Sequence, residues 1–89
     1  MKAVQLHITG RVQGVGFRAF THGKAWMLGV RGWCRNTEDG AVEGEAEGEE
    51  GPLGAFVLAI EEGPPASRVD QVLTVDADVG PFEGFDIRR

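Results

Sequence analysis

The strongest constraint on the fold is the order in which two hydrophobic periods follow one another along the 89 residues. Apolar residues that alternate with polar ones, as at Val4, Leu6 and Ile8, are typical of a strand with one buried face. Apolar residues spaced i, i+3, i+4 and i+7 are typical of an amphipathic helix. Strand patterns cover residues 4–9, 30–37, 42–47, 69–75 and 85–87, and helical patterns cover residues 17–28 and 53–60.

This order, β-α-β-β-α-β with a short extra strand, predicts a ferredoxin-like α+β fold. In that βαββαβ sandwich, two helices pack on one face of an antiparallel sheet. We expect a single domain over residues 1–89, because a chain of 9.6 kDa is large enough for only one core. The only cysteine, Cys34, excludes an intrachain disulfide, so the core must hold the fold together alone.

Turn residues mark the breaks between these patterns. Gly29 follows the first helical pattern, where a left-handed residue can end a helix. Pro52 suits a helix start, and Gly-Pro-Pro at residues 63–65 ends the second helical pattern. Asp-Gly at residues 39–40 is a strong hairpin signal between the second and third strands.

The charges are divided unevenly along the chain. Residues 1–37 contain six basic residues and no acid, whereas residues 38–89 contain all fourteen acids and three arginines. The regional charges of +6 and -11 sum to the net charge of -5. Either the basic half binds a small anion, or the two halves pair within the fold. The acidic pI of 4.9 argues against a protein that coats nucleic acid.

No segment suggests a membrane or an export signal. No apolar run approaches the ~18 residues of a membrane span. Gln5 and His7 interrupt the position where a signal peptide would have its apolar core. We therefore expect a cytoplasmic protein without a membrane or nucleic-acid partner, and we expect a monomer.

Residues 10–18, Gly-Arg-Val-Gln-Gly-Val-Gly-Phe-Arg, join the first strand to the first helix. Gly14 and Gly16 allow the backbone to adopt positive φ and to approach a ligand closely. The first N–H groups of the helix have no internal partner, so the loop can form a nest of donors for phosphate. Arg18 adds a guanidinium that can bind a phosphoryl group through two hydrogen bonds. A glycine-rich turn beside a solvated arginine is the alternative.

Asn36 is the only asparagine and lies at the end of the second strand pattern. Its amide both donates and accepts hydrogen bonds, so it could hold a water molecule in one orientation. The alternative is an asparagine selected for the turn that follows.

Other features have structural explanations. The spacing Gly-x-Gly-x-x-Ala at residues 14–19 matches a dinucleotide fingerprint, but the chain is too short for a doubly wound sheet. The acidic run Glu43, Glu45, Glu47, Glu49 and Glu50 is expected to be a solvated edge, and the strand that contains the first three is expected to have one face in water. Cys34 is expected to be a small buried hydrophobe. Trp26 and Trp33 are expected to be packing residues.

Residues 10–18, together with Gly-Trp-Cys-Arg-Asn-Thr-Glu-Asp-Gly-Ala-Val at residues 32–42, resemble the acylphosphatase family. Residues 43–48 resemble its third strand and residues 82–88 its closing strand, so the resemblance covers nearly the whole chain. Two separated motifs in the same register make it specific. Cys34, where small aliphatic residues are usual, and the glycines of residues 51–54 depart from the family pattern.

The resemblance implies hydrolysis of a small-molecule acyl phosphate to a carboxylate and inorganic phosphate, with no metal and no other cofactor. It implies that Arg18 is the charged clamp and that Asn36 positions the attacking water. It assigns phosphate binding to six consecutive residues: Gln13, Gly14, Val15, Gly16, Phe17 and Arg18. This reaction fits the absence of acids in residues 1–37, because phosphoryl transfer needs mostly positioning and charge stabilisation.

Alternatives remain. A non-catalytic ferredoxin-like module that binds a small anion would use the loop but would not need Asn36. Acylphosphatase-like domains also begin hydrogenase-maturation carbamoyltransferases, which act on carbamoyl phosphate. We expect the free enzyme, because the 89 residues contain no second domain.

Overall fold

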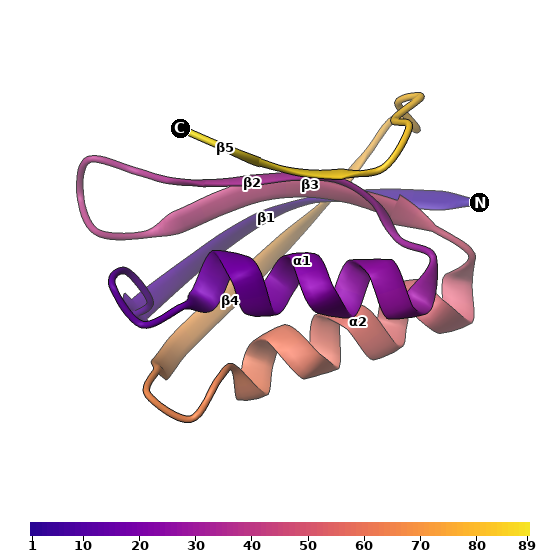
Figure 1. Ribbon diagram of the computed structural model, residues 1–89. Coiled ribbons are helices and arrows are strands. Elements are labelled where there is room, and N and C mark those ends of the chain that lie inside the picture. The colour runs from indigo at the N-terminus through magenta and orange to yellow at the C-terminus, as the bar shows by residue number, and fades with distance from the viewer.

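The computed structural model describes all 89 residues and places two helices on one face of a five-stranded sheet (Figure 1). The elements follow in the order β1 (Lys2–Arg11), α1 (Phe17–Leu28), β2 (Arg31–Asn36), β3 (Val42–Gly48), α2 (Glu50–Glu62), β4 (Arg68–Ala77) and β5 (Phe85–Arg88). The predicted ferredoxin-like α+β fold is confirmed. Neither helix is long and apolar enough to cross a membrane.

The strands lie in the order β4-β1-β3-β2-β5. The pairs β1–β3, β1–β4 and β2–β3 are antiparallel, but β5 pairs with β2 in parallel. The sheet is therefore mixed, which corrects the prediction of an antiparallel sheet. The reason is the connection from β4, which crosses to the opposite edge of the sheet before β5 begins. In consequence β5 lies beside β2, where Cys34 faces Ile87 across the pair.

The core lies between the sheet and the helices. The alternation in β1 buries Val4, Leu6 and Ile8 toward the helices, as predicted. Phe17 from α1 and Phe56 from α2 are almost completely buried against them. Each such side chain contributes about 1.5–3 kcal/mol by leaving water. One cluster of fourteen buried residues holds the fold, as expected for a chain without a disulfide.

The prediction for the glutamates of β3 was wrong in two respects. β3 is the central strand of the sheet, not an edge. Glu47 is completely buried, and its carboxylate accepts hydrogen bonds from the N–H groups of Gly80 and Phe82. It also pairs with Arg31 at 3.4 Å. The segment between β4 and β5 covers Glu47, so alternation within β3 could not reveal its burial. Glu43 and Glu45 remain partly exposed.

The two tryptophans lie on different surfaces. Trp26 on α1 is 79% exposed, so the prediction that it packs in the fold was wrong. Trp33 lies on the open face of the sheet and is half-buried. The guanidinium carbons of Arg35 and Arg88 lie 5.4 and 4.6 Å from its ring centroid, so Trp33 packs against two cations.

Candidate active site

A cleft of about 210 Å³ lies where the β1–α1 loop meets the ends of β2 and β5. Its lining residues are Val12, Gly14, Gly16, Phe17, Arg18, Ala19, Asn36 and Ile87. The structure therefore brings Arg18 and Asn36 to one cleft, although they are far apart in the sequence. No acidic side chain lines it.

Two glycines shape the loop at this cleft. Gly14 and Gly16 have φ angles of 73° and 76°, in the left-handed region. An L residue in that conformation costs roughly 1–2 kcal/mol. No atom lies within 4 Å of the Cβ that an alanine would add at either position. The backbone conformation, not lack of space, therefore explains the two glycines.

The start of α1 leaves hydrogen-bond donors free at the cleft. The first N–H bonded within the helix is that of Phe20, which donates to the carbonyl of Gly16 at 3.0 Å. The N–H groups of Phe17, Arg18 and Ala19 come earlier and have no helical partner. Gly16 supplies no capping side chain, and the first turn contains no acid. The positive end of the helix dipole is thus uncompensated, which favours phosphate binding.

The Arg18 guanidinium is the only formal charge among the cleft residues. Arg18 is half-buried and takes part in none of the three ion pairs of the fold. Two other arginines of the basic half are paired: Arg31 with Glu47 and Arg35 with Glu43. Part of the charge asymmetry is therefore explained by pairing within the fold, whereas Arg18 has no acidic partner.

Cys34 lies beside this charge on β2. Burial raises the pKa of its thiol from 9.0 to about 11, and the positive charge of Arg18 offsets part of that rise. The thiol is 1% exposed and protonated at neutral pH. It is a small buried hydrophobe, as predicted, and not a nucleophile.

Asn36 is the last residue of β2, and its side chain lines the cleft. Its Oδ1 atom is buried and has no hydrogen-bond partner in the protein. Buried polar atoms are almost always hydrogen-bonded. An unpartnered acceptor at the cleft is therefore suited to a donor that arrives with the substrate, or to a water molecule.

Gln13 differs from the other predicted phosphate-binding residues. Its Nε2 donates to the carbonyls of Thr37 and Ala41 at 2.8 and 2.9 Å. The side chain thus ties the β1–α1 loop to the hairpin after Asn36, and only its backbone N–H remains for an anion. The Val15 side chain is likewise partly buried against the core and does not line the cleft.

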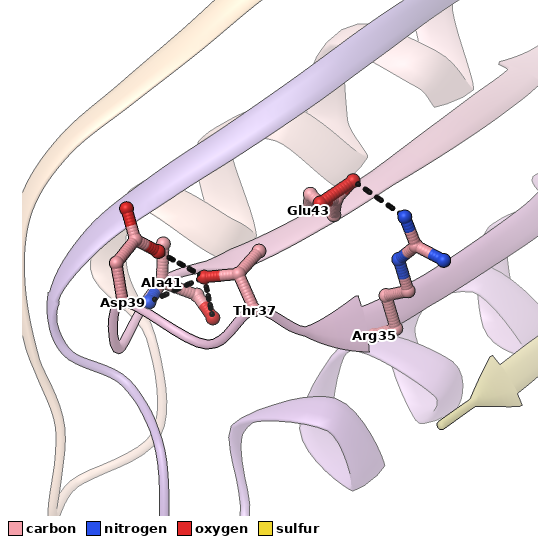
Figure 2. A network of polar contacts seen from close by, with 5 residues as sticks. All are labelled: Arg35, Thr37, Asp39, Ala41 and Glu43. Atoms are coloured by element: carbon pink, nitrogen blue, oxygen red, sulfur yellow. Dashed lines mark hydrogen bonds and ion pairs between the residues drawn. The ribbon is translucent and has the colours of Figure 1, made fainter.

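The hairpin to which Gln13 is hydrogen-bonded has its own network of hydrogen bonds (Figure 2). The Thr37 hydroxyl donates to the carboxylate of Asp39, and the Ala41 N–H donates to the Thr37 Oγ1 at 3.0 Å. The bond from Thr37 holds the pKa of Asp39 below its usual value. Nearby, Arg35 donates to Glu43 at 3.3 Å. Arg35 directly follows the buried Cys34 in β2, so the two side chains lie on opposite faces of the sheet. Asn36 therefore precedes a well-ordered turn.

Ile87 is a cleft residue that was not predicted from the sequence. Its side chain is 43% exposed and forms part of the wall beside Asn36. The alternation of Phe85 and Ile87 indicated a strand, but no local signal indicated that this strand pairs with β2. As for metal ligands, no three His, Cys, Asp or Glu side chains form a group that could hold a metal ion.

Comparison with known proteins assigns the family. The acylphosphatase family model matches residues 4–87. This chain belongs to the acylphosphatase family. The acylphosphatase of Salinibacter ruber is 50% identical to this family member, over 99% of this chain and 94% of that protein. The crystal structure of acylphosphatase from Bacillus subtilis is 37% identical, has a TM-score of 0.97 and is covered completely, as is this chain.

The same fold also occurs inside a longer protein. The crystal structure of HypF from T. kodakarensis matches this acylphosphatase family member with a TM-score of 0.86 and 32% identity. That match covers 100% of this chain but 12% of HypF.

Proposed function

We propose that this protein hydrolyses acyl phosphates to a carboxylate and inorganic phosphate, and that it needs no metal ion. Family membership supports the reaction. The unpartnered Oδ1 of Asn36, in the same cleft as the unpaired Arg18, is the observation that carries the assignment of roles.

The phosphoryl group binds at the start of α1. Backbone N–H groups of residues 13–18 donate to its oxygens, and the Arg18 guanidinium binds two of them through parallel hydrogen bonds. This set of donors neutralises the charge that spreads over the oxygens in the transition state. The same donors can perform the task that a metal ion performs in other phosphoryl-transfer sites, which supports metal independence.

Asn36 positions the nucleophile. A water molecule donates one hydrogen bond to Oδ1, which turns its oxygen lone pair toward phosphorus. The water oxygen forms a bond to phosphorus as the bond from phosphorus to the acyl oxygen breaks, and the carboxylate leaves with that electron pair. The cleft contains no carboxylate or imidazole base. The water proton therefore passes to an oxygen of the phosphoryl group itself.

We further propose that the protein acts as a monomer in the cytoplasm. The single cysteine is not in a disulfide, as is usual in a reducing compartment. Light scattering during gel filtration tests the first statement, and fractionation of the source cells tests the second.

The deciding assay is phosphate release from benzoyl phosphate in the presence of a strong chelator. We expect turnover under these conditions, with inorganic phosphate as a competitive inhibitor because it occupies the same donors. A site that binds phosphate but never releases it from an acyl phosphate would be a binding module. Activity that returned only on addition of a divalent metal would contradict metal independence.

Asn36→Ala tests the division of roles. It should lower kcat by at least ~10², the typical cost of misplacing a reacting group by about 1 Å. Phosphate affinity, measured by isothermal titration, should stay close to wild type because the donors of residues 13–18 remain. Asn36→Asp should lose as much turnover and also bind phosphate more weakly, since it adds a negative charge. Equal losses of turnover and phosphate affinity in Asn36→Ala would make Asn36 a binding or folding residue.

A further inference from the structure

We propose that the groove between α1 and β5 binds the acyl group of the substrate and selects acyl phosphates with an extended, uncharged acyl chain. The proposal rests on the acyl phosphate hydrolysis proposed above. It names the part of the substrate that the phosphoryl cleft leaves unassigned.

The groove begins at the cleft itself. A hollow of about 430 Å³ is lined by His22, Ala25 and Trp26 of α1 and by Phe85 and Asp86 at the start of β5, among others. The cleft is lined by Ala19 of α1 and Ile87 of β5. Ala19 lies one helical turn before His22, and Ile87 directly follows Asp86. The cleft and the hollow therefore share both walls, along elements that are in contact with each other.

Trp26 gives the groove an apolar wall that the fold itself does not use. Its side chain is 79% exposed although it is among the largest apolar groups in the chain. Ala19, His22 and Trp26 have the spacing i, i+3 and i+7, so they lie on one stripe of α1. Long helical side chains lean toward the N-terminus, here toward the cleft.

The reach of the groove suits an extended chain. Trp26 is eight residues after Arg18, which corresponds to about 12 Å along the helix axis. An acyl group that extends from the phosphoryl site along α1 would first pass Ala19 and Ile87 and then His22. It would meet the indole of Trp26 only when the chain is several carbons long.

The direction of the reaction favours this groove over a second hollow near the cleft. That hollow, of about 410 Å³, is lined only by polar residues, and Asn36, Arg35 and Arg89 are among them. Phosphoryl transfer places the attacking and leaving oxygens on opposite sides of phosphorus. The water is held at Asn36, so the hollow that contains Asn36 lies on the water side. The α1–β5 hollow does not include Asn36 and is free to receive the leaving acyl group.

Charge at the far end of the groove sets the preference for an uncharged chain. Glu83 lines the hollow there, whereas Asp86 pairs with Trp33 and directs its side chain to the open face of the sheet. Arg31, the only cationic side chain in its lining, is paired with the buried Glu47. A terminal carboxylate or phosphate on the acyl group would be repelled by Glu83, whereas an alkyl chain can cover Trp26 and Ile87 without that cost.

The test compares kcat/KM for acetyl, butanoyl and hexanoyl phosphate. The three carboxylates are leaving groups of similar acidity, so chain length chiefly changes the contacts with the groove. A fully buried methylene is worth about 4-fold, and one buried on a single side about 2-fold. Hexanoyl adds four methylenes to acetyl, so we expect kcat/KM to rise by about 16-fold from acetyl to hexanoyl phosphate in the wild-type protein.

Two variants identify the residue responsible. Trp26→Ala should flatten this gradient while acetyl phosphate is still hydrolysed at the wild-type rate. Met27→Ala is the matched control, because Met27 is the next residue, is 78% exposed and does not line the hollow. It should keep the gradient. A flat gradient in the wild type, an unchanged one in Trp26→Ala, or an equal loss in Met27→Ala would overturn the acyl groove and leave the proposed hydrolysis standing.

A binding measurement separates the groove from the hydrolysis. Isothermal titration should give tighter binding of monohexyl phosphate than of inorganic phosphate to the wild type, and equal binding of the two to Trp26→Ala. If no acyl phosphate is hydrolysed, the proposed function fails. In that case this titration alone tests the groove, and equal affinity of the wild type for monohexyl phosphate and inorganic phosphate would overturn it.

Discussion

Gln13→Ala removes the one side chain that links the two halves of the cleft. Nε2 of Gln13 donates to the carbonyls of Thr37 and Ala41, so it ties the loop before α1 to the hairpin after Asn36. The free energy that this tie contributes can be worked out from the contacts that remain when it is lost.

Each of the two hydrogen bonds contributes about 1 kcal/mol to stability. Neither carbonyl is left without a donor in the variant. The Thr37 carbonyl still accepts from the Gly40 N–H at 3.4 Å, and the Ala41 carbonyl still accepts from the Thr37 N–H at 2.9 Å. The larger cost of an orphaned buried acceptor therefore does not apply. We expect a loss of about 2 kcal/mol, which corresponds to roughly 8–16 °C in Tm for a domain of this size.

The same change should lower turnover beyond its effect on folding. Without the tie, the loop that bears Arg18 and the strand end that bears Asn36 can shift relative to each other. A displacement of about 1 Å costs up to ~10² in rate, so kcat should fall by about tenfold or more well below the Tm. The assays are thermal and urea unfolding followed by circular dichroism, and acyl phosphate kinetics at a temperature where the variant is fully folded.

Gln71→Ala is the control, because Gln71 is an exposed glutamine on β4 that makes no side-chain hydrogen bond within the protein. It should change Tm and kcat little. If Gln13→Ala were as stable as Gln71→Ala, the tie would contribute nothing to the fold. If Gln13→Ala lost stability but kept wild-type kcat, the tie would not position the site.

Three further perturbations test other parts of the molecule. Arg18→Lys should recover little of the turnover lost in Arg18→Ala, because an ammonium cannot supply two parallel hydrogen bonds; near-normal kinetics in the lysine variant would contradict the clamp. Glu47→Ala should lower the free energy of unfolding in urea by about 3 kcal/mol, because the N–H groups of Gly80 and Phe82 lose a charged acceptor. Glu43 lies on the same face of β3 but is partly exposed, so Glu43→Ala should lower the free energy of unfolding by less than about 1 kcal/mol. Equal losses of stability in the two variants would show that burial of Glu47 has no special effect. Because the pKa of Cys34 is raised, the folded state keeps the thiol proton at a pH where the unfolded state releases it. The contribution of this thiol to the free energy of unfolding is therefore complete below pH 9.0. That contribution should fall by up to about 3 kcal/mol as the pH rises to about 11, and urea unfolding of Cys34→Ala over the same range should lack this fall.

The element order was predictable because each element carries its own local signal. The helical stripe from Phe17 ends at Gly29, which adopts a left-handed φ of 69° as a C-cap should. The Asp-Gly pair at residues 39–40 lies in the turn of the β2–β3 hairpin. These signals depend on neighbours within a few residues, so a single sequence contains them in full.

Features that depend on distant segments were not predictable. β5 has four residues, and nothing in them encodes a parallel partner in β2, so the place of Ile87 in the cleft was hidden. The alternation in β3 predicts that Glu47 faces water, but residues 80–82, which are more than thirty residues further along the chain, bury it. The exposure of Trp26 was not predictable either, because a large apolar residue is buried only where another segment covers it, and none covers Trp26.

The motif at residues 10–18 shows what a sequence pattern can and cannot resolve. The resemblance to acylphosphatases assigned phosphate binding to six consecutive residues, but their side chains make different contacts in the structure. Gly14, Gly16 and Arg18 line the cleft, whereas the Gln13 side chain holds the hairpin. A pattern records that each residue type is needed, but only the fold shows which residue can contact a ligand and which one supports it.

The cleft gathers several local departures from a stable fold at one place. Two residues adopt left-handed backbone, α1 begins without a capping side chain, and the Oδ1 of Asn36 is buried without a partner. An orphaned buried acceptor alone costs about 1–3 kcal/mol, a considerable part of the 5–15 kcal/mol that stabilises a typical domain. These features share one property, because each leaves a donor or acceptor ready at the position where an anion and a water molecule would use it. A domain held by one core and the Gln13 tie can maintain them together, and that preorganisation is what a reaction driven by positioning requires.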